Sequence, residues 1–253
     1  MAKGASIKFK SYEETIPKIL DLLKLENGLA NADTVVIKPF LLNPTEKYVS
    51  VDLVEQVLRF CLMHKKSLAK IFIAEGADGY DTMDLFDELG YRKLSERYSI
   101  GLIDLNNTET ESIEKAQFEK FKSIDYPSIL KNSFVISLAK LDEDEELGIT
   151  GSLPSMLGAF PGSSYKGLLS RKKSKIRKWP IKYSINDIIQ CKMPDFAIID
   201  ASSKGLILAG LPLDIDKQAA KILDKDWKSI PYISLIEENS ILREVEKPLE
   251  SEI

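Results

Sequence analysis

The chain has 253 residues, of which 35 are lysine or arginine and 39 are aspartate or glutamate, so its formal net charge is −4. This balance argues against a surface built wholly for nucleic acid. No apolar stretch approaches the roughly 20 residues that span a bilayer, and the charged N-terminal segment lacks the apolar region of a secretory signal. We therefore expect a cytoplasmic protein without a membrane partner.

Five short hydrophobic runs predict the strands of a parallel sheet. Each run ends in a polar or charged cluster, and the runs cover residues 34–38, 70–74, 100–103, 133–138 and 196–199. Apolar spacing predicts helices at residues 12–25, 51–65, 82–89, 185–189 and 214–223. The charged segment 111–121 is either a surface helix or a long solvated excursion. This alternation predicts an α/β fold, with a mainly parallel sheet flanked by helices in three Rossmann-like layers.

A glycine-rich stretch in the middle of the chain breaks this alternation. Residues 147–167 also contain Pro154 and Pro161, and cannot form a long helix or a central strand. The stretch fits a ligand-binding loop and a plain surface loop equally well, because it contains no phosphate-binding motif. We predict a single α/β domain over residues 1–235, with an irregular, loop-rich insertion at about 141–183. Apolar spacing is lost from about residue 236, which predicts a mobile tail over residues 236–253.

The polar residues at the strand ends are candidates for a binding site, because ligands of parallel sheets bind outside the carboxyl ends of the strands. Lys38 follows an apolar run and precedes Pro39, which places it at a strand terminus. Burial there would lower its pKa and suit it to acid–base work or to anchoring an anion. A Lys38→Ala change would then abolish ligand binding without unfolding the chain. The candidate positive charges are Lys38, Lys140 and Lys166, and the candidate acidic groups are Glu75, Asp104 and Asp200.

The chain contains few residues suited to nucleophilic or metal chemistry. Cys61 falls on a helical apolar stripe and Cys191 closes an apolar segment, so both are expected to be core residues rather than ligands. The only histidine, His64, closes a predicted helix, where a cation complements the helix dipole. We predict no disulfide and no resident metal site.

Two charge blocks flank the glycine-rich stretch. Residues 142–146 (DEDEE) are expected to form a solvated acidic turn rather than a cation site. Residues 171–182 carry seven basic residues and no acid. Basic charge interleaved with aromatics suits single-stranded nucleic acid or another polyanion; the alternative is that the block simply neutralises the acidic one. The candidate polyanion-binding residues are Arg171, Lys172, Lys173, Lys175, Arg177, Lys178 and Trp179.

Seven segments resemble, in order, the uncharacterised family catalogued as domain of unknown function 362. They are VVIKPF, IFIAEGADG, GLIDLNN, FVISLAKL, GITGSLPSMLGAFP, PDFAIIDA and DKQAAKIL, spanning about residues 34–233. Some members of that family carry ferredoxin-like iron–sulfur modules. The resemblance implies roles for several of the strand-end residues, adds Thr150 to the ligand-binding candidates, and matches Asp216 to an aspartate of the last helix.

The sequence departs from the family pattern beside Lys140. This lysine matches the first position of a Lys-Leu-Lys-Thr-His signature, but acidic residues 142–144 replace the second lysine, the threonine and the histidine. Pro154 and Ser155 replace a usual lysine–asparagine pair. The chain also lacks a C-x-x-C-x-x-C cluster, so we expect a divergent, stand-alone member without an iron–sulfur cluster; any other cofactor is left open.

These observations predict a protein that binds a small anionic metabolite at the carboxyl ends of its strands, with the reaction left open. The alternative is a non-catalytic interaction protein that binds RNA or a protein partner through residues 171–182. Nucleic acid is the less favoured partner, because the whole chain is acidic. The sequence does not predict the oligomeric state.

Overall fold

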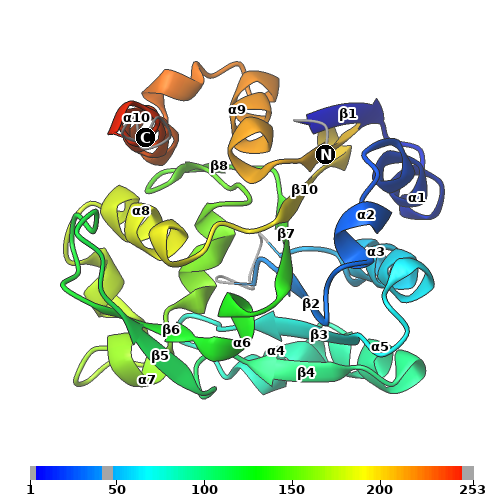
Figure 1. Cartoon of the computed structure of the whole chain (residues 1–253), viewed down its shortest axis with the longest axis horizontal. Helices are drawn as coiled ribbons and strands as arrows, with labels where there is room; N and C mark the ends of the chain where they lie inside the picture. The colour runs from blue at the N-terminus through cyan, green and yellow to red at the C-terminus, as the bar shows by residue number, and fades with distance from the viewer. Residues whose placement is uncertain (1–3, 42–47, 247–253) are drawn as a thin grey trace, which may run out of the picture.

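A seven-stranded sheet forms the centre of the computed structural model, which describes residues 4–41 and 48–246 (Figure 1). From one edge to the other, its strands are β1 (Gly4–Lys8), β11 (Leu206–Gly210), β10 (Phe196–Ala201), β7 (Phe134–Lys140), β2 (Thr34–Pro39), β3 (Lys70–Glu75) and β4 (Gly101–Asp104). Two short ladders lie outside it, one of β5 (Thr110–Ile113) with β6 (Ile124–Pro127) and one of β8 (Glu143–Asp144) with β9 (Gly148–Ile149).

The five strands from β10 to β4 are parallel, whereas β11 runs antiparallel to both of its neighbours. The chain adds β3 and β4 on one side of β2, and then adds β7 and β10 on the other. The direction in which successive strands are added therefore reverses between β2 and β7. Such a reversal opens a crevice at the carboxyl ends of the strands. The predicted α/β class and all five predicted strands are confirmed.

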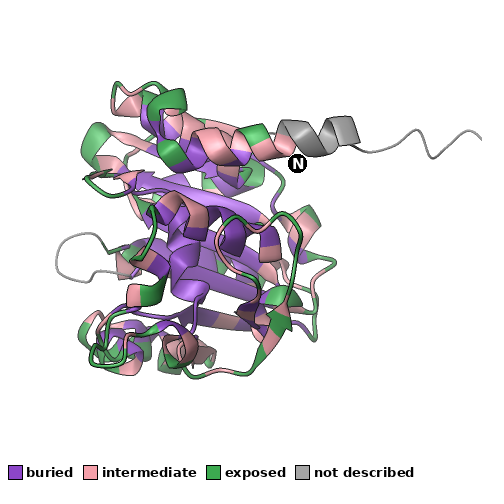
Figure 2. Cartoon of the chain, turned by 90° about the vertical axis from the view of Figure 1, so that its left-hand side faces the viewer, coloured by how far each residue is buried: buried purple, intermediate pink, exposed green. Residues whose placement is uncertain are grey.

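Helices cover both faces of the sheet (Figure 1). One group is α1 (Tyr12–Leu22), α2 (Glu26–Leu29) and α3 (Val51–His64), and the other is α8 (Ile181–Cys191), α9 (Pro212–Ile222) and α10 (Pro231–Glu246). Beside β4 lies α5 (Tyr91–Tyr98), which packs against α4 (Thr82–Glu88). The shorter helices are α6 (Ser128–Lys131), α7 (Gly162–Tyr165) and the 3-10 turns η1 (Pro154–Ala159), η2 (Ser174–Arg177), η3 (Ser202–Lys204) and η4 (Trp227–Ser229). Figure 2 shows the sheet buried between these layers.

Local sequence explains where the main helices begin. The side chains of Ser11, Ser50 and Asp81 accept hydrogen bonds from the first backbone N–H groups of α1, α3 and α4. These bonds satisfy donors that have no partner inside the helix. Covered on both faces, β2 and β10 are buried along almost their whole length, as is expected of central parallel strands.

Two predicted segments differ from the structure. The helix considered for residues 111–121 is wrong, because β5 ends at Ile113 and no helix follows before β6 among the described residues. Regular structure also continues beyond residue 236, since α10 extends to Glu246 and buries Ile236. The polar run from Glu237 to Ser240 hides this helix in the sequence. The remainder of the expected tail, residues 247–253, lies outside the described residues.

A buried aspartate joins the glycine-rich stretch to the helical layer. Asp216 of α9 is fully buried and accepts hydrogen bonds from the Ser152 backbone N–H at 2.8 Å, the Ser152 hydroxyl at 2.7 Å and the Leu153 N–H at 3.1 Å. The Tyr232 hydroxyl donates a fourth bond at 3.0 Å. Burial raises the pKa of Asp216 to about 6, while these donors oppose the shift. One side chain therefore holds the turn before η1 against α9 and α10.

We predict that Asp216→Ala lowers the free energy of unfolding by about 3–5 kcal/mol, because it leaves buried donors without an acceptor. Tyr232→Phe removes a single bond and should lower it by about 1 kcal/mol. Urea unfolding of the two variants and the parent protein measures both values. Losses of equal size in the two variants would show that Asp216 does not organise this turn.

Candidate functional site

A buried ion pair links the carboxyl ends of β2 and β3. The Lys38 Nζ lies 2.6 Å from Glu75 Oε2, and neither side chain has any exposed surface. Lys38 also donates to the Ser155 carbonyl at 2.5 Å, and Glu75 Oε1 accepts from the Gly76 N–H at 2.8 Å. Burial lowers the pKa of Lys38, while the Glu75 carboxylate opposes that shift. Lys38 therefore lies at a strand terminus as predicted, but its described contacts are internal.

The glycine-rich stretch closes over this pair. A Cβ atom on Gly158 would lie 1.6 Å from Glu75 Oε1 and 2.8 Å from Lys38 Nζ, and one on Gly76 would lie 2.4 Å from the Gly158 carbonyl oxygen. Any side chain at Gly158 would displace the buried charges. Glycine is required here because it lets the backbone of η1 approach the end of β3.

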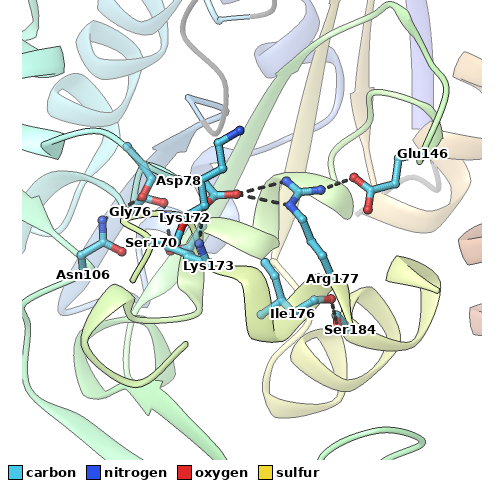
Figure 3. Close-up of polar contacts among 12 residues, drawn as sticks. Gly76, Asp78, Asn106, Glu146, Ser170, Lys172, Lys173, Ile176, Arg177 and Ser184 are labelled. Atoms are coloured by element: carbon cyan, nitrogen blue, oxygen red, sulfur yellow. Dashed lines mark hydrogen bonds and ion pairs between the residues drawn. The ribbon is translucent and has the colours of Figure 1, made fainter. Parts of the chain in front are cut away.

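A second buried lysine packs beside the pair. The Lys173 Nζ donates to the carbonyls of Gly76 at 2.7 Å and Gly158 at 3.2 Å, and its backbone N–H donates to Asp78 at 2.5 Å (Figure 3). Burial lowers the pKa of Lys173 to about 7. Lys173 was a candidate for polyanion binding, but it is fully buried. It anchors the basic segment, residues 171–182, to the loop after β3.

An open cavity of about 350 Å³ lies at the carboxyl ends of β3 and β4. It is bordered by the loops after these strands, by α7 and by the basic segment, and its lining residues are Ala77, Tyr80, Asp81, Thr82, Asp104, Asn106, Asn107, Gly162, Ser163, Lys166 and Arg171. Three predicted candidates, Asp104, Lys166 and Arg171, thus come together from distant parts of the chain. This cavity is the candidate site.

Asn106 holds the walls of the cavity together. Its side-chain amide donates to the Ala77 carbonyl at 2.9 Å and to the Thr82 hydroxyl oxygen at 3.1 Å. Its side-chain oxygen accepts from the Gly162 N–H at 2.9 Å. Asp104 supports the turn, because its carboxylate accepts from the Asn106 N–H at 2.9 Å and from the Asn107 amide at 2.6 Å. The hydrogen bonds of the Asp104 carboxylate therefore stabilise the wall of the cavity rather than leave it free to contact a ligand.

The cavity offers hydrogen-bond donors. The hydroxyl oxygen of buried Thr82 accepts from both the Ala77 N–H, at 3.2 Å, and Asn106. Two acceptor contacts occupy its lone pairs, so its O–H hydrogen remains to be donated, and no described residue accepts it. Lys166 and Arg171 are exposed, and neither forms an ion pair with another described residue. A donor and two cations that pair with no other described residue suit a negatively charged ligand.

The other predicted ligand-binding residues lie elsewhere. Lys140 is exposed at the end of β7, whereas Thr150 is buried and donates its hydroxyl to the Lys140 carbonyl at 2.5 Å while accepting from the Asp142 N–H at 2.7 Å. Asp200 accepts from the Tyr12 hydroxyl at 2.6 Å and from the Ser202 N–H at 2.9 Å. These residues hold turns together and do not line the cavity.

Sequence reasoning missed Thr82 and Asn106. Asn106 follows the end of β4 by two positions, so a wider search for polar strand-end residues would have included it. The role of Thr82 depends on a contact between two loops, and no pattern in the sequence indicates it.

The basic segment is divided between interior and surface. Arg177 pairs with Asp78 at 3.2 Å and with Glu146 of the acidic block (Figure 3). The predicted mutual neutralisation of the two blocks is therefore present at this pair. Lys172, Lys178 and Trp179 are exposed, as is the last remaining candidate, Lys175, which donates to the Ser164 carbonyl at 2.7 Å. The segment does not form one continuous cationic strip.

The two cysteines and the histidine, which were considered for nucleophilic or metal chemistry, pack against other parts of the fold. Cys61 is buried and Cys191 is partly buried, and both are free thiols. Burial raises the pKa of each to about 12. The His64 ring stacks on Phe60 with 4.3 Å between ring centroids. Across residues 4–41 and 48–246, no three histidine, cysteine, aspartate or glutamate side chains group together as a metal site.

The family model described as Domain of unknown function (DUF362) matches residues 35–206. The chain belongs to the DUF362 family. Comparison with curated proteins gave no match. Among solved structures, the DUF362 chain is similar to a Thermotoga maritima protein that was a structural-genomics target, with 13% identity and a TM-score of 0.46. The alignment covers 86% of this chain and 61% of that one. In the described part of this DUF362 protein, no helix has the length and apolarity needed to cross a bilayer.

For this DUF362 protein, the structure changes what we expect of Lys38→Ala. The variant would leave the Glu75 carboxylate buried without its partner, so we predict a fall in the free energy of unfolding of about 3–5 kcal/mol. Exchanging both charges, as Lys38→Met with Glu75→Leu, should cost less than Lys38→Ala alone, because no unpaired charge remains. Urea unfolding of the three proteins provides the measurement. A Lys38→Ala variant as stable as the parent would contradict this assignment.

Lys173 should make the stability of the DUF362 protein depend on pH. Its pKa is about 7 in the folded chain and ordinarily 10.5, so the unfolded chain binds more protons between these values. The free energy of unfolding should therefore rise with pH from about 7 to about 10, by roughly 1 kcal/mol per pH unit relative to Lys173→Met, and the difference should be flat below pH 7. Lys172→Met, at the exposed neighbour, is the control. Parallel pH profiles for the parent and Lys173→Met would refute the prediction.

Proposed function

We propose that this DUF362 protein binds a small anionic metabolite in the cavity at the carboxyl ends of β3 and β4. The observation that carries the proposal is the presence of two exposed cations, Lys166 and Arg171, on one cavity with a buried hydroxyl donor, Thr82. Hydrogen bonds from charged donors to carboxylates or phosphates are stronger than neutral ones. The reaction, if there is one, is left open.

The cavity also restricts the kind of anion. Its volume of about 350 Å³ is near the lower end of the usual range for ligand pockets, about 300–1,000 Å³. Asp81 and Asp104 lie on the same lining as the two cations, and would repel a larger ligand that carries negative charge at several positions. A small molecule with one anionic group and a neutral polar part fits this charge pattern, and the half-exposed ring of Tyr80 offers it an apolar contact.

The buried charges serve this site indirectly. Lys173 and Arg177 hold the basic segment on the loop after β3. The same loop contains Ala77 and Tyr80, which line the cavity. Lys38 and Glu75 hold the end of β3 against β2. We assign these residues to positioning rather than to ligand contact. A cytoplasmic location belongs to the same proposal and is supported by the two free thiols.

Removing either cation should weaken anion binding. We predict that Arg171→Ala and Lys166→Ala each lower the affinity for inorganic phosphate, or for a carboxylate or phosphate ester found in a metabolite panel, by about tenfold or more, since charge-assisted hydrogen bonds contribute about 1.5–3 kcal/mol. Titration calorimetry measures the affinities.

Lys178→Ala is the matched control for these variants, because Lys178 is exposed on the same segment but does not line the cavity. It should bind with the parent's affinity. Unchanged affinity in both cavity variants, or an equal loss in Lys178→Ala, would remove the cavity as the binding site.

A further inference from the structure

Two adjacent leucines project into solvent at the tip of the loop that borders the cavity. Leu168 and Leu169 have 100% and 98% of their surface exposed. Single exposed leucines are common on protein surfaces and need no explanation. Two consecutive side chains without any cover leave a continuous apolar surface in water, which favours transfer to an apolar environment. No role in the cavity accounts for these leucines, because neither lines it.

The loop that carries the leucines has a defined shape. The Gly167 N–H donates to the Lys172 carbonyl at 3.2 Å across its base, and the Lys172 N–H donates to the Ser170 hydroxyl at 3.1 Å. The Ser174 hydroxyl oxygen packs closely against Gly167, 2.6 Å from where a Cβ atom would lie. Lys173 follows immediately and is fully buried. The leucines are therefore presented by a closed, anchored turn.

Cations surround this apolar tip. Lys166, Arg171 and Lys172 lie on the two sides of the leucines, and all three are exposed. No acidic residue occurs anywhere between Lys166 and Lys182. The acids on the neighbouring loops are already engaged: Asp78 pairs with Arg177, Asp81 accepts hydrogen bonds from the first turn of α4, and Asp104 accepts from Asn106 and Asn107. The loop thus combines an apolar centre with a positively charged border.

We propose that the loop of residues 166–172 docks onto an anionic lipid surface. Leucines enter the boundary between headgroups and acyl chains, while lysine and arginine near the surface are attracted by anionic lipids. Such a contact needs no membrane-spanning segment, and it departs from the expectation that the protein has no membrane partner. It would place the opening of the cavity beside the lipid surface, since Lys166 and Arg171 belong to both.

The composition of the tip favours lipid over the other partners of a basic surface. Single-stranded nucleic acid is bound by stacking of its bases on aromatic side chains, and the tip presents aliphatic ones. A stable protein interface buries about 800 Å² on each partner, far more than two leucine side chains offer. Insertion into a lipid boundary requires only a small apolar tip with cations around it.

Vesicle co-sedimentation tests the proposal directly. The parent protein should sediment with vesicles that mix phosphatidylserine into phosphatidylcholine, stay in solution with phosphatidylcholine alone, and lose binding as salt is added. Leu168→Ser with Leu169→Ser should reduce binding by about a hundredfold or more, because two apolar side chains no longer transfer from water to the lipid boundary. Leu22→Ser, at an exposed leucine of α1, should bind as the parent does.

The outcomes separate this proposal from the cavity's function. The double leucine variant should keep the parent's melting temperature and its affinity for phosphate, since both side chains are exposed to solvent and neither lines the cavity. Full vesicle binding by that variant would overturn the proposal, as would failure of the parent to bind mixed vesicles. Binding of the parent to an unstructured RNA but not to vesicles would overturn it in favour of nucleic acid. None of these results depends on whether the cavity binds an anion.

Discussion

The structure at the carboxyl ends of β2 and β3 depends on the buried ion pair between Lys38 and Glu75. Two charges without access to water lose their hydration, and this loss is offset only when their contacts are short and their remaining hydrogen bonds are made. The Ser155 carbonyl and the Gly76 N–H supply those bonds, and the Ser155 carbonyl reaches Lys38 because Gly158 has no side chain to keep η1 away. The ends of β2 and β3 and the turn that covers them are therefore determined together.

Much of the fold was predictable because central parallel strands are buried on both faces. The runs at β2, β3, β7 and β10 are nearly continuous in hydrophobic residues, and this pattern needs no knowledge of their partners. The edge strand β1 was missed for the same physical reason: it is only partly buried, and its short sequence GASIK carries little pattern. Its partner β11 was also missed, although it is buried and reads LILAG. The helix α10 was obscured by a polar run, and what holds it is the packing of Ile233 and Ile236, a tertiary effect.

The candidate site was less predictable than the fold, because a strand-end position does not say which way a side chain faces. Lys38 and Asp104 both end parallel strands, yet one is sealed beneath η1 and the other lies at an open cavity. Lys172 and Lys173 are identical neighbours in a basic run, and only the carbonyls of Gly76 and Gly158 distinguish the buried one. Such differences arise from contacts between loops that are distant in the sequence, and local composition does not predict them.

The edge strand β1 has a consequence for how the chain forms during translation. Its sheet partner is β11, and the first and last pairs of their register are Gly4 with Gly210 and Lys8 with Leu206. At the usual rate of about 5–20 residues per second, roughly 10 to 40 seconds separate the synthesis of the two strands. Until β11 leaves the ribosome, β1 has no neighbour and the outer edge of β10 is open. The edge of β10 is open only briefly, because β10 is made just before β11, whereas the unpaired edges of β1, which are prone to aggregation, are exposed for nearly the whole of the synthesis of the chain.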